Sequence, residues 1–149
     1  MKALTVMPPY AMQIWARQKD IEYRSWKTDY RGDILITSSS RRVRDCVCGY
    51  ALCVAELYDI TPRMEYEIGV KNPQLGFAGE YLWHLRNIRP IKPFPIKGKL
   101  NLWETEKVGV TEANLEFLPR YPEDGVTEAE ENAWFDELIQ PLIYAPRKR

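Results

Sequence analysis

The feature that most constrains the fold of this chain is a series of short strand-like segments that follow one another closely over its first hundred residues. In residues 20–26 and 80–91, side chains of two unlike kinds alternate, and this period of two is typical of a strand with two different faces. Residues 50–60 (YALCVAELYDI) form the strongest strand candidate. Strands this close together in sequence favour antiparallel pairing. Further strands are predicted at residues 3–7, 34–37 and 98–103.

Two helices accompany these strands. Residues 10–19 follow the Pro8-Pro9 pair, and their apolar side chains recur three and four positions apart, which is typical of one helix face. Residues 127–140 form the second predicted helix. Thr127 is suited to cap its first turn, and Glu130, three positions on, is suited to complete a capping box.

Together these elements predict an α+β fold, a small and mostly antiparallel β-barrel that carries helices. At 149 residues the chain has the length of one ordinary domain. We expect the barrel domain to span residues 1–104, and an acidic, helical extension, residues 105–149, to pack on it. Residues 61–78 contain two prolines and two glycines, so they are predicted to form an irregular connection.

The net charge of the chain is zero, but its two parts carry opposite net charges. Residues 1–103 hold 16 lysines and arginines against 10 acidic residues, whereas residues 104–149 hold 5 against 11. A basic body points to an anionic partner. The acidic tail either covers a basic groove of the body or packs against its outside.

Composition and the cysteines argue against several kinds of site. No run of eighteen apolar residues is present, so no membrane span is expected. The first residues do not resemble a signal peptide, and three cysteines within eight positions do not make a disulfide framework, so we expect a cytoplasmic protein. Those cysteines form a single cluster far from the only histidine, His84, whereas metal sites usually combine two clusters. Neither a metal nor a cofactor is expected.

Four residues near the corner between the first helix and the second strand carry side chains that can grip a nucleobase. Glu22 and Arg24 lie two positions apart on a strand, so they point the same way. Lys19 precedes them at the corner, and Trp26 continues the same face. An indole stacks on a base, a carboxylate accepts from an exocyclic amine, and cations hold phosphate. The alternative is an exposed row of ion pairs beside a half-buried tryptophan, because most surface charge pairs are weak.

A second group of basic and hydroxyl side chains follows this corner. Cations and serine hydroxyls of this kind hold the backbone oxygens of a nucleic acid. A solvated loop beside an acidic tail explains the same residues equally well, so both interpretations stand. The group consists of Arg31, Arg41, Arg42 and Arg44, with Ser38, Ser39 and Ser40 beside them.

The run from Lys19 to Gly32 resembles the signature of the ASCH family. In that signature a lysine is followed by a glutamate three positions on, by an arginine five positions on, and then by a Ser-Trp-x-Thr-x-Tyr-Arg-Gly stretch, all of which this chain has. The resemblance extends over about residues 3–104. The family usually has a glycine two residues before the lysine, and here that residue is Arg17. The segments that resemble the family's first helix, central strand and closing strand are Pro8-Pro9-Tyr10-Ala11, Val54-Ala55-Glu56-Leu57 and Gly98-Lys99-Leu100-Asn101-Leu102-Trp103.

The resemblance implies a PUA-like barrel that binds RNA or a modified nucleotide or nucleoside in a pocket at the helix–strand corner. It also implies an alternative, because some ASCH-like proteins resemble hydrolases that deacylate cytidine or cleave RNA. The amidohydrolase pattern has a threonine three positions after the lysine and a glutamate later in the chain. Here Glu22 replaces that threonine, and Glu65 or Glu67 is nearest to the later acid. If the protein is a metal-independent hydrolase, Lys19 and Glu22 are its catalytic candidates.

Overall fold

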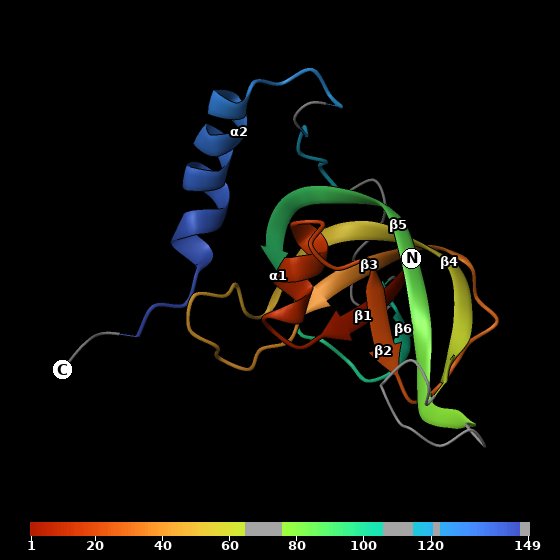
Figure 1. Cartoon of the computed structure of the whole chain (residues 1–149). Helices are drawn as coiled ribbons and strands as arrows, with labels where there is room; N and C mark the ends of the chain where they lie inside the picture. Colours follow the sequence, from red (N-terminus) through yellow and green to blue (C-terminus); the bar gives the residue numbers. More distant parts are fainter. Residues whose placement is uncertain (65–75, 106–114, 121–122, 147–149) are drawn as a thin grey trace.

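The computed structural model describes residues 1–64, 76–105, 115–120 and 123–146. Six strands and two α-helices make up the described part of the chain (Figure 1). The second helix continues into a π-helical turn, Phe135–Ile139, and a short 3₁₀ turn, Gln140–Leu142. In chain order the elements are β1 (Lys2–Val6), α1 (Tyr10–Trp15), β2 (Ile21–Arg24), β3 (Gly32–Ser38), β4 (Tyr50–Met64), β5 (Phe77–Pro95), β6 (Leu102–Glu104) and α2 (Glu128–Trp134).

The strands form one sheet in the order β2-β5-β4-β3-β1-β6. Four of its pairings are antiparallel, and only β1 and β3 run parallel, with Leu4 opposite Ile36. The predicted α+β class and mostly antiparallel pairing are confirmed. The predicted closure into a barrel is not confirmed, because β2 and β6 are the two edges of this sheet and no pairing between described strands joins them.

The two longest strands extend well beyond their predicted limits. β4 continues to Met64, and β5 runs from Phe77 through Pro93 to Pro95. The prediction of an irregular connection over residues 61–78 is therefore wrong at both ends, because residues 61–64 belong to β4 and residues 77–78 belong to β5. Residues 65–75 lie outside the described part. The β4–β5 ladder changes register at four points, one of them between Pro62 and Met64. Such bulges tolerate proline and bend a strand, which accounts for the strong curl of the sheet around α1 (Figure 1).

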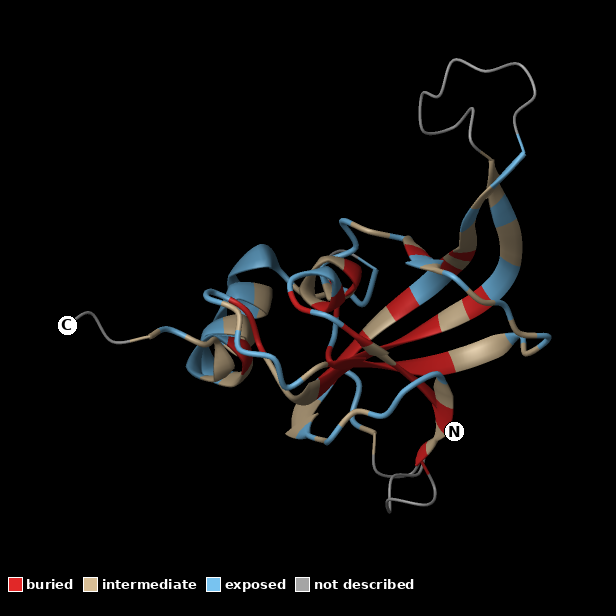
Figure 2. Cartoon of the chain, turned by 90° about the horizontal axis from the view of Figure 1, so that it is seen from below, coloured by how far each residue is buried: buried red, intermediate tan, exposed pale blue. Residues whose placement is uncertain are grey.

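Both faces of the middle of the sheet are buried (Figure 2). One face packs against α1 through Ile14, and against the end of the tail through Ile139. The opposite face packs Leu35 and Val54 against Trp103. Burial on both faces explains why the β3 segment is a continuous apolar run and not an alternating one.

The C-terminal tail packs on the outside of the sheet beside α1 (Figure 1). The Thr127–Glu130 capping box is present, with Glu130 N donating to Thr127 Oγ1 at 3.1 Å and Thr127 N donating to Glu130 Oε2 at 2.8 Å. The Trp134 ring meets the Trp15 ring edge-on with centroids 6.0 Å apart. The predicted helix at residues 127–140 is divided into two parts, because α2 ends at Trp134 and a π-helical turn begins at Phe135.

Candidate functional site

The end of α1 determines where Lys19 lies. The helix stops at Trp15, four residues before the predicted end, because Arg17 adopts the left-handed conformation with φ 61°. The backbone N–H groups of Gln18 and Lys19 then both donate to the carbonyl of Gln13, at 2.8 and 3.1 Å. This tight reversal brings Lys19 directly to the start of β2.

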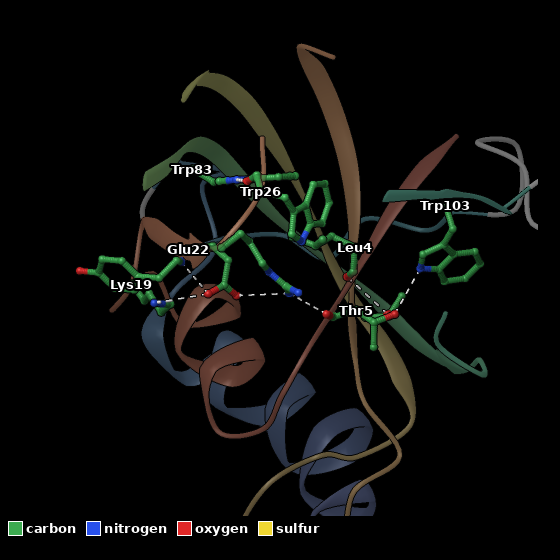
Figure 3. Close-up of polar contacts among 10 residues, drawn as sticks. Leu4, Thr5, Lys19, Glu22, Trp26, Trp83 and Trp103 are labelled. Atoms are coloured by element: carbon green, nitrogen blue, oxygen red, sulfur yellow. Dashed lines mark hydrogen bonds and ion pairs between the residues drawn. The ribbon is translucent and has the colours of Figure 1, made fainter. Parts of the chain in front are cut away.

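Glu22 is the centre of a charged group at that corner (Figure 3). It is only 6% exposed, and its Oε1 accepts from the backbone N–H of Tyr23 at 2.9 Å. Lys19 Nζ lies 3.8 Å from Oε1, and Arg24 Nη2 lies 3.8 Å from Oε2. The side chains of Glu22 and Arg24 therefore meet, as a two-residue spacing on a strand requires, and Lys19 joins them.

Arg24 links two strands that do not pair. Its Nη2 donates to the carbonyl of Thr5 in β1 at 2.7 Å, so the guanidinium spans from β2 to β1 (Figure 3). Burial lowers the pKa of Arg24, and the charge of Glu22 opposes that shift. The negative charge of Glu22 thus stabilises the charged form of Arg24, which burial alone would disfavour.

Two tyrosine rings surround the ammonium of Lys19. Nζ lies 4.5 Å from the ring centroid of Tyr23 and 5.4 Å from that of Tyr10. The guanidinium of Arg63 lies 4.7 Å from the Tyr23 ring. Cation–π contacts of this kind hold a cation without neutralising its charge, so the charge of Lys19 stays available to a ligand.

These residues line a cavity of about 1040 Å³. Its walls carry five cationic side chains and one acidic side chain, that of Glu22. Cavities of this volume accept small-molecule ligands of nucleotide size. The lining residues come from β1, the turn after it and the start of α1 (Thr5, Val6, Met7, Tyr10), from the corner and β2 (Lys19, Glu22, Tyr23, Arg24), from the loop after β3 (Ser39, Ser40, Arg41) and from the loop before β6 (Lys97, Gly98, Lys99, Leu100, Asn101).

Comparison with known proteins identifies the family. A sequence profile of the ASCH domain matches residues 4–116. The chain belongs to the ASCH domain family. Among solved structures it is similar to the ASCH protein of Zymomonas mobilis, with a TM-score of 0.52, 14% identity, and 77% of this chain and 95% of that chain covered. A point mutant of that protein gives a TM-score of 0.54, 15% identity, and coverage of 77% and 98%. At these identities the likeness establishes a shared fold, and no curated protein matches this chain.

The cavity of this ASCH domain contains six of the residues that the sequence singled out. They are Lys19, Glu22, Arg24, Ser39, Ser40 and Arg41. Whether these residues bind a ligand stays a prediction, but their convergence on one cavity is a property of the fold.

Four other candidates lie elsewhere in the ASCH domain. Trp26 follows the end of β2, so the alternation stops before it; its ring packs edge-on against Trp83, with centroids 4.7 Å apart. Ser38 is buried and its hydroxyl donates to the carbonyl of Val47. Arg31 is exposed and donates to two nearby backbone carbonyls, and Arg42 lies over the Tyr144 ring. None of these four lines the cavity.

The cavity also includes residues that the sequence analysis did not select. Thr5 comes from β1, Tyr10 comes from the first turn of α1, and Lys97 and Lys99 come from the loop before β6. The only local signal was the pair of lysines around Gly98, and nothing in their spacing connects them to Lys19. In the described part of the tail, residues 115–120 and 123–146, no residue lines this cavity. These described residues of the tail therefore pack outside the cavity and do not cover it.

The three cysteines Cys46, Cys48 and Cys53 are free thiols, and Cys46 and Cys53 are buried. Within the described ranges no three His, Cys, Asp or Glu side chains are grouped to hold a metal ion. Burial raises the pKa of Cys53 to about 12, against the opposing charges of Arg120 and Arg89.

No described helix has the length and apolar character needed to cross a bilayer. Glu65 and Glu67, the late acids of the hydrolase pattern, lie outside the described residues.

Proposed function

We propose that the cavity of this ASCH domain binds a nucleotide or a nucleotide segment of single-stranded RNA. The observation that carries this proposal is the composition of the cavity walls, where five cations and two partly exposed tyrosines surround one buried carboxylate. Cations attract phosphate, aromatic rings stack on bases, and a fixed carboxylate accepts from a base amine. Family membership supports the same function, because PUA-like ASCH domains are related to RNA-binding modules.

Each group has a distinct role in this proposal. Glu22 accepts from an exocyclic amine, while Lys19 and Arg24, each 3.8 Å from its carboxylate, contact ligand oxygens. Tyr10, which is 48% exposed, offers a ring face for stacking. This replaces the role first expected for Trp26, whose ring is engaged with Trp83.

The test is a binding measurement with the full chain. Short single-stranded RNAs and the four ribonucleotides are titrated into the parent protein and into Lys19→Ala, at two salt concentrations, by calorimetry. We expect Lys19→Ala to lose at least about tenfold in affinity, which corresponds to about 1.4 kcal/mol. For RNA, log K should fall with log salt by about 0.7 for each phosphate contact.

Arg31→Ala is the matched control, because it removes a cation that is exposed and outside the cavity. Its affinity should equal that of the parent. Equal affinity of Lys19→Ala and the parent, with both proteins folded, would refute the assignment of the site.

Hydrolysis is the second candidate, favoured by one observation. Lys19 and Glu22 lie 3.8 Å apart inside the cavity, and a carboxylate beside a cation can act as a general base toward water. Incubation with acylated cytidine and with short RNAs tests this. Turnover by the parent that is lost in both Lys19→Ala and Glu22→Gln would identify an enzyme, whereas ligand retention without turnover would identify a binding module.

A further inference from the structure

The cations of the cavity fall into two groups with different partners. At the inner end, Lys19 and Arg24 both lie 3.8 Å from the carboxylate of Glu22. At the rim, Arg41, Lys97 and Lys99 are exposed, and none of the three lies within ion-pair distance of a carboxylate in the described part of the chain. At the inner end one carboxylate balances one of two cations, whereas the three rim cations have no such counter-charge, so most of the excess positive charge of the cavity lies at its rim.

The loop that carries two of the rim cations is attached firmly to the sheet. The backbone N–H of Lys99 donates to Thr5 Oγ1 at 3.2 Å, and Thr5 Oγ1 also accepts from Trp103 Nε1 at 3.2 Å (Figure 3). At the start of the loop, Ile96 N donates to the carbonyl of Gly49 at 3.0 Å. Gly98 lies so close to Thr5 that a Cβ atom there would be only 2.5 Å from Thr5 Cγ2.

The third rim cation comes from a different loop and reaches the same cavity. Arg41 follows β3, and its Nη1 lies 3.5 Å from the sulfur of Met7, which also lines the cavity. Three like charges around one opening repel one another, and an anion bound among them offsets that repulsion. Cationic side chains supplied by two loops suit a phosphate group, which offers several charged oxygens at once.

We infer that Arg41, Lys97 and Lys99 form a phosphate site at the cavity rim, so that the ligand is a phosphorylated nucleotide whose base points to Glu22. This inference rests on the proposed function of the cavity and adds both the ligand class and its orientation. The phosphate is either the monoester of a free nucleotide or RNA end, or the diester of an RNA backbone. Neutral nucleosides fill only the inner end.

The experiment compares ligands that differ only in phosphate. The four ribonucleosides, their 5′- and 3′-monophosphates and the matching dinucleoside monophosphates are titrated into the full-length protein by calorimetry at low salt. For at least one base, a phosphorylated form should bind at least about tenfold more tightly than its nucleoside. In the triple variant Arg41→Ala/Lys97→Ala/Lys99→Ala this advantage should disappear, while nucleoside affinity stays unchanged.

Controls separate the rim from general charge effects. The double variant Arg31→Ala/Lys92→Ala removes two exposed cations that do not line the cavity, and it should keep the full phosphate advantage. If only the monophosphates bind more tightly than the nucleosides, the site takes a terminal phosphate. If the dinucleoside monophosphates also bind more tightly, the site takes an RNA backbone phosphate.

Two results overturn the inference. If nucleosides and phosphorylated forms bind the parent equally, the phosphate site fails while the proposed function stands. If the phosphate advantage persists in the triple variant, the assignment of these three residues fails. Absence of binding by every nucleoside, nucleotide and RNA refutes the proposed function together with the inference.

Discussion

At the scale of single residues, the site depends on one backbone conformation that L-amino acids disfavour. Arg17 has φ 61° and ends α1, so that Lys19 reaches β2 at once. The Arg17 guanidinium donates to both carboxylate oxygens of Glu123, at 2.8 and 3.3 Å, and these hydrogen bonds are the main cause of the lowered pKa of Glu123. Both partners are exposed, so this pair contributes little to stability.

Replacing Arg17 tests the conformational cost directly. Arg17→Gly and Arg17→Ala both lose the contact with Glu123, but only glycine adopts the left-handed conformation without steric cost. Avoiding the steric cost of a Cβ atom favours glycine over alanine by about 1–2 kcal/mol. The greater conformational freedom of glycine in the unfolded chain cancels about 0.5–1 kcal/mol of this advantage. We expect Arg17→Gly to be more stable than Arg17→Ala by about 0.5–1 kcal/mol in urea unfolding. Equal midpoints for the two variants would contradict this account.

The buried thiol of Cys53 predicts a pH dependence of stability. Its pKa rises from 9.0 to about 12 on folding, so between these values the folded chain keeps a proton that the unfolded chain has lost. Stability is therefore complete below about pH 9 and falls as pH rises toward 12, by at most about 1.4 kcal/mol per pH unit from this group.

Urea unfolding at pH 8, 9 and 10 measures this dependence in the parent and in Cys53→Ala. The variant is expected to be less stable at pH 8, because a buried group is removed, but its free energy of unfolding should fall less steeply with pH. Parallel curves for the two proteins would show that Cys53 is not the group responsible.

At the scale of elements, the cavity depends on loops held by the edges of strands. β6 pairs with β1 only as far as Leu4, and beyond that point Thr5 receives hydrogen bonds from Arg24 and from the loop before β6. Side chains and loop backbone thus occupy the place where a closed barrel would have paired strands. The opening that remains is the cavity.

Gly98→Ala tests the attachment of this loop. Because the new Cβ would meet Thr5 Cγ2 at 2.5 Å and Thr5 Oγ1 at 2.6 Å, the loop must shift, at a cost of about 1–3 kcal/mol in unfolding free energy. The shift should also weaken binding of phosphorylated nucleotides, because it displaces Lys97 and Lys99. Gly76→Ala is the control, since no atom lies within 4 Å of its added Cβ. A Gly98→Ala protein with unchanged stability and affinity would refute the anchoring role.

At the scale of the whole molecule, the end of the tail packs beside α1 and shares the hydrophobic core on that face of the sheet. Ile139 is fully buried in the same cluster as Ile14 and Leu52, and Leu118 is buried after an isolated bridge between Ile91 and Phe117. The division into residues 1–104 and 105–149 remains a prediction, and this packing leads us to expect that the first part is unstable alone.

Ile139→Ala measures the contribution of the tail without deleting it. Removing three methyl or methylene carbons from a fully buried isoleucine should lower the free energy of unfolding by about 2–5 kcal/mol. Leu100→Ala is the control, because Leu100 is 89% exposed and its loss should change stability by less than about 0.5 kcal/mol. A small effect of Ile139→Ala would show that the tail is dispensable for folding.

The amino-acid sequence by itself determined the features that arise from neighbouring residues. Alternation predicted β2 and the middle of β5, the Thr127–Glu130 pair predicted the start of α2, and a two-residue spacing brought Glu22 and Arg24 together. These follow from backbone geometry over a few positions, so a local pattern is enough to identify them. The same local rule failed for Trp26, because β2 ends at Arg24.

Only the tertiary structure decided the shape and the charge of the cavity. Thr5, Lys97 and Lys99 are distant in sequence from Lys19, and the curl of the sheet brings β1, the corner before β2 and the loop before β6 to one opening. That curl comes from bulges within a paired ladder, and bulge positions depend on the partner strand as much as on the strand's own residues. The open sheet is likewise a tertiary outcome, because Arg24 joins β2 to β1 through a side-chain hydrogen bond and not through strand pairing.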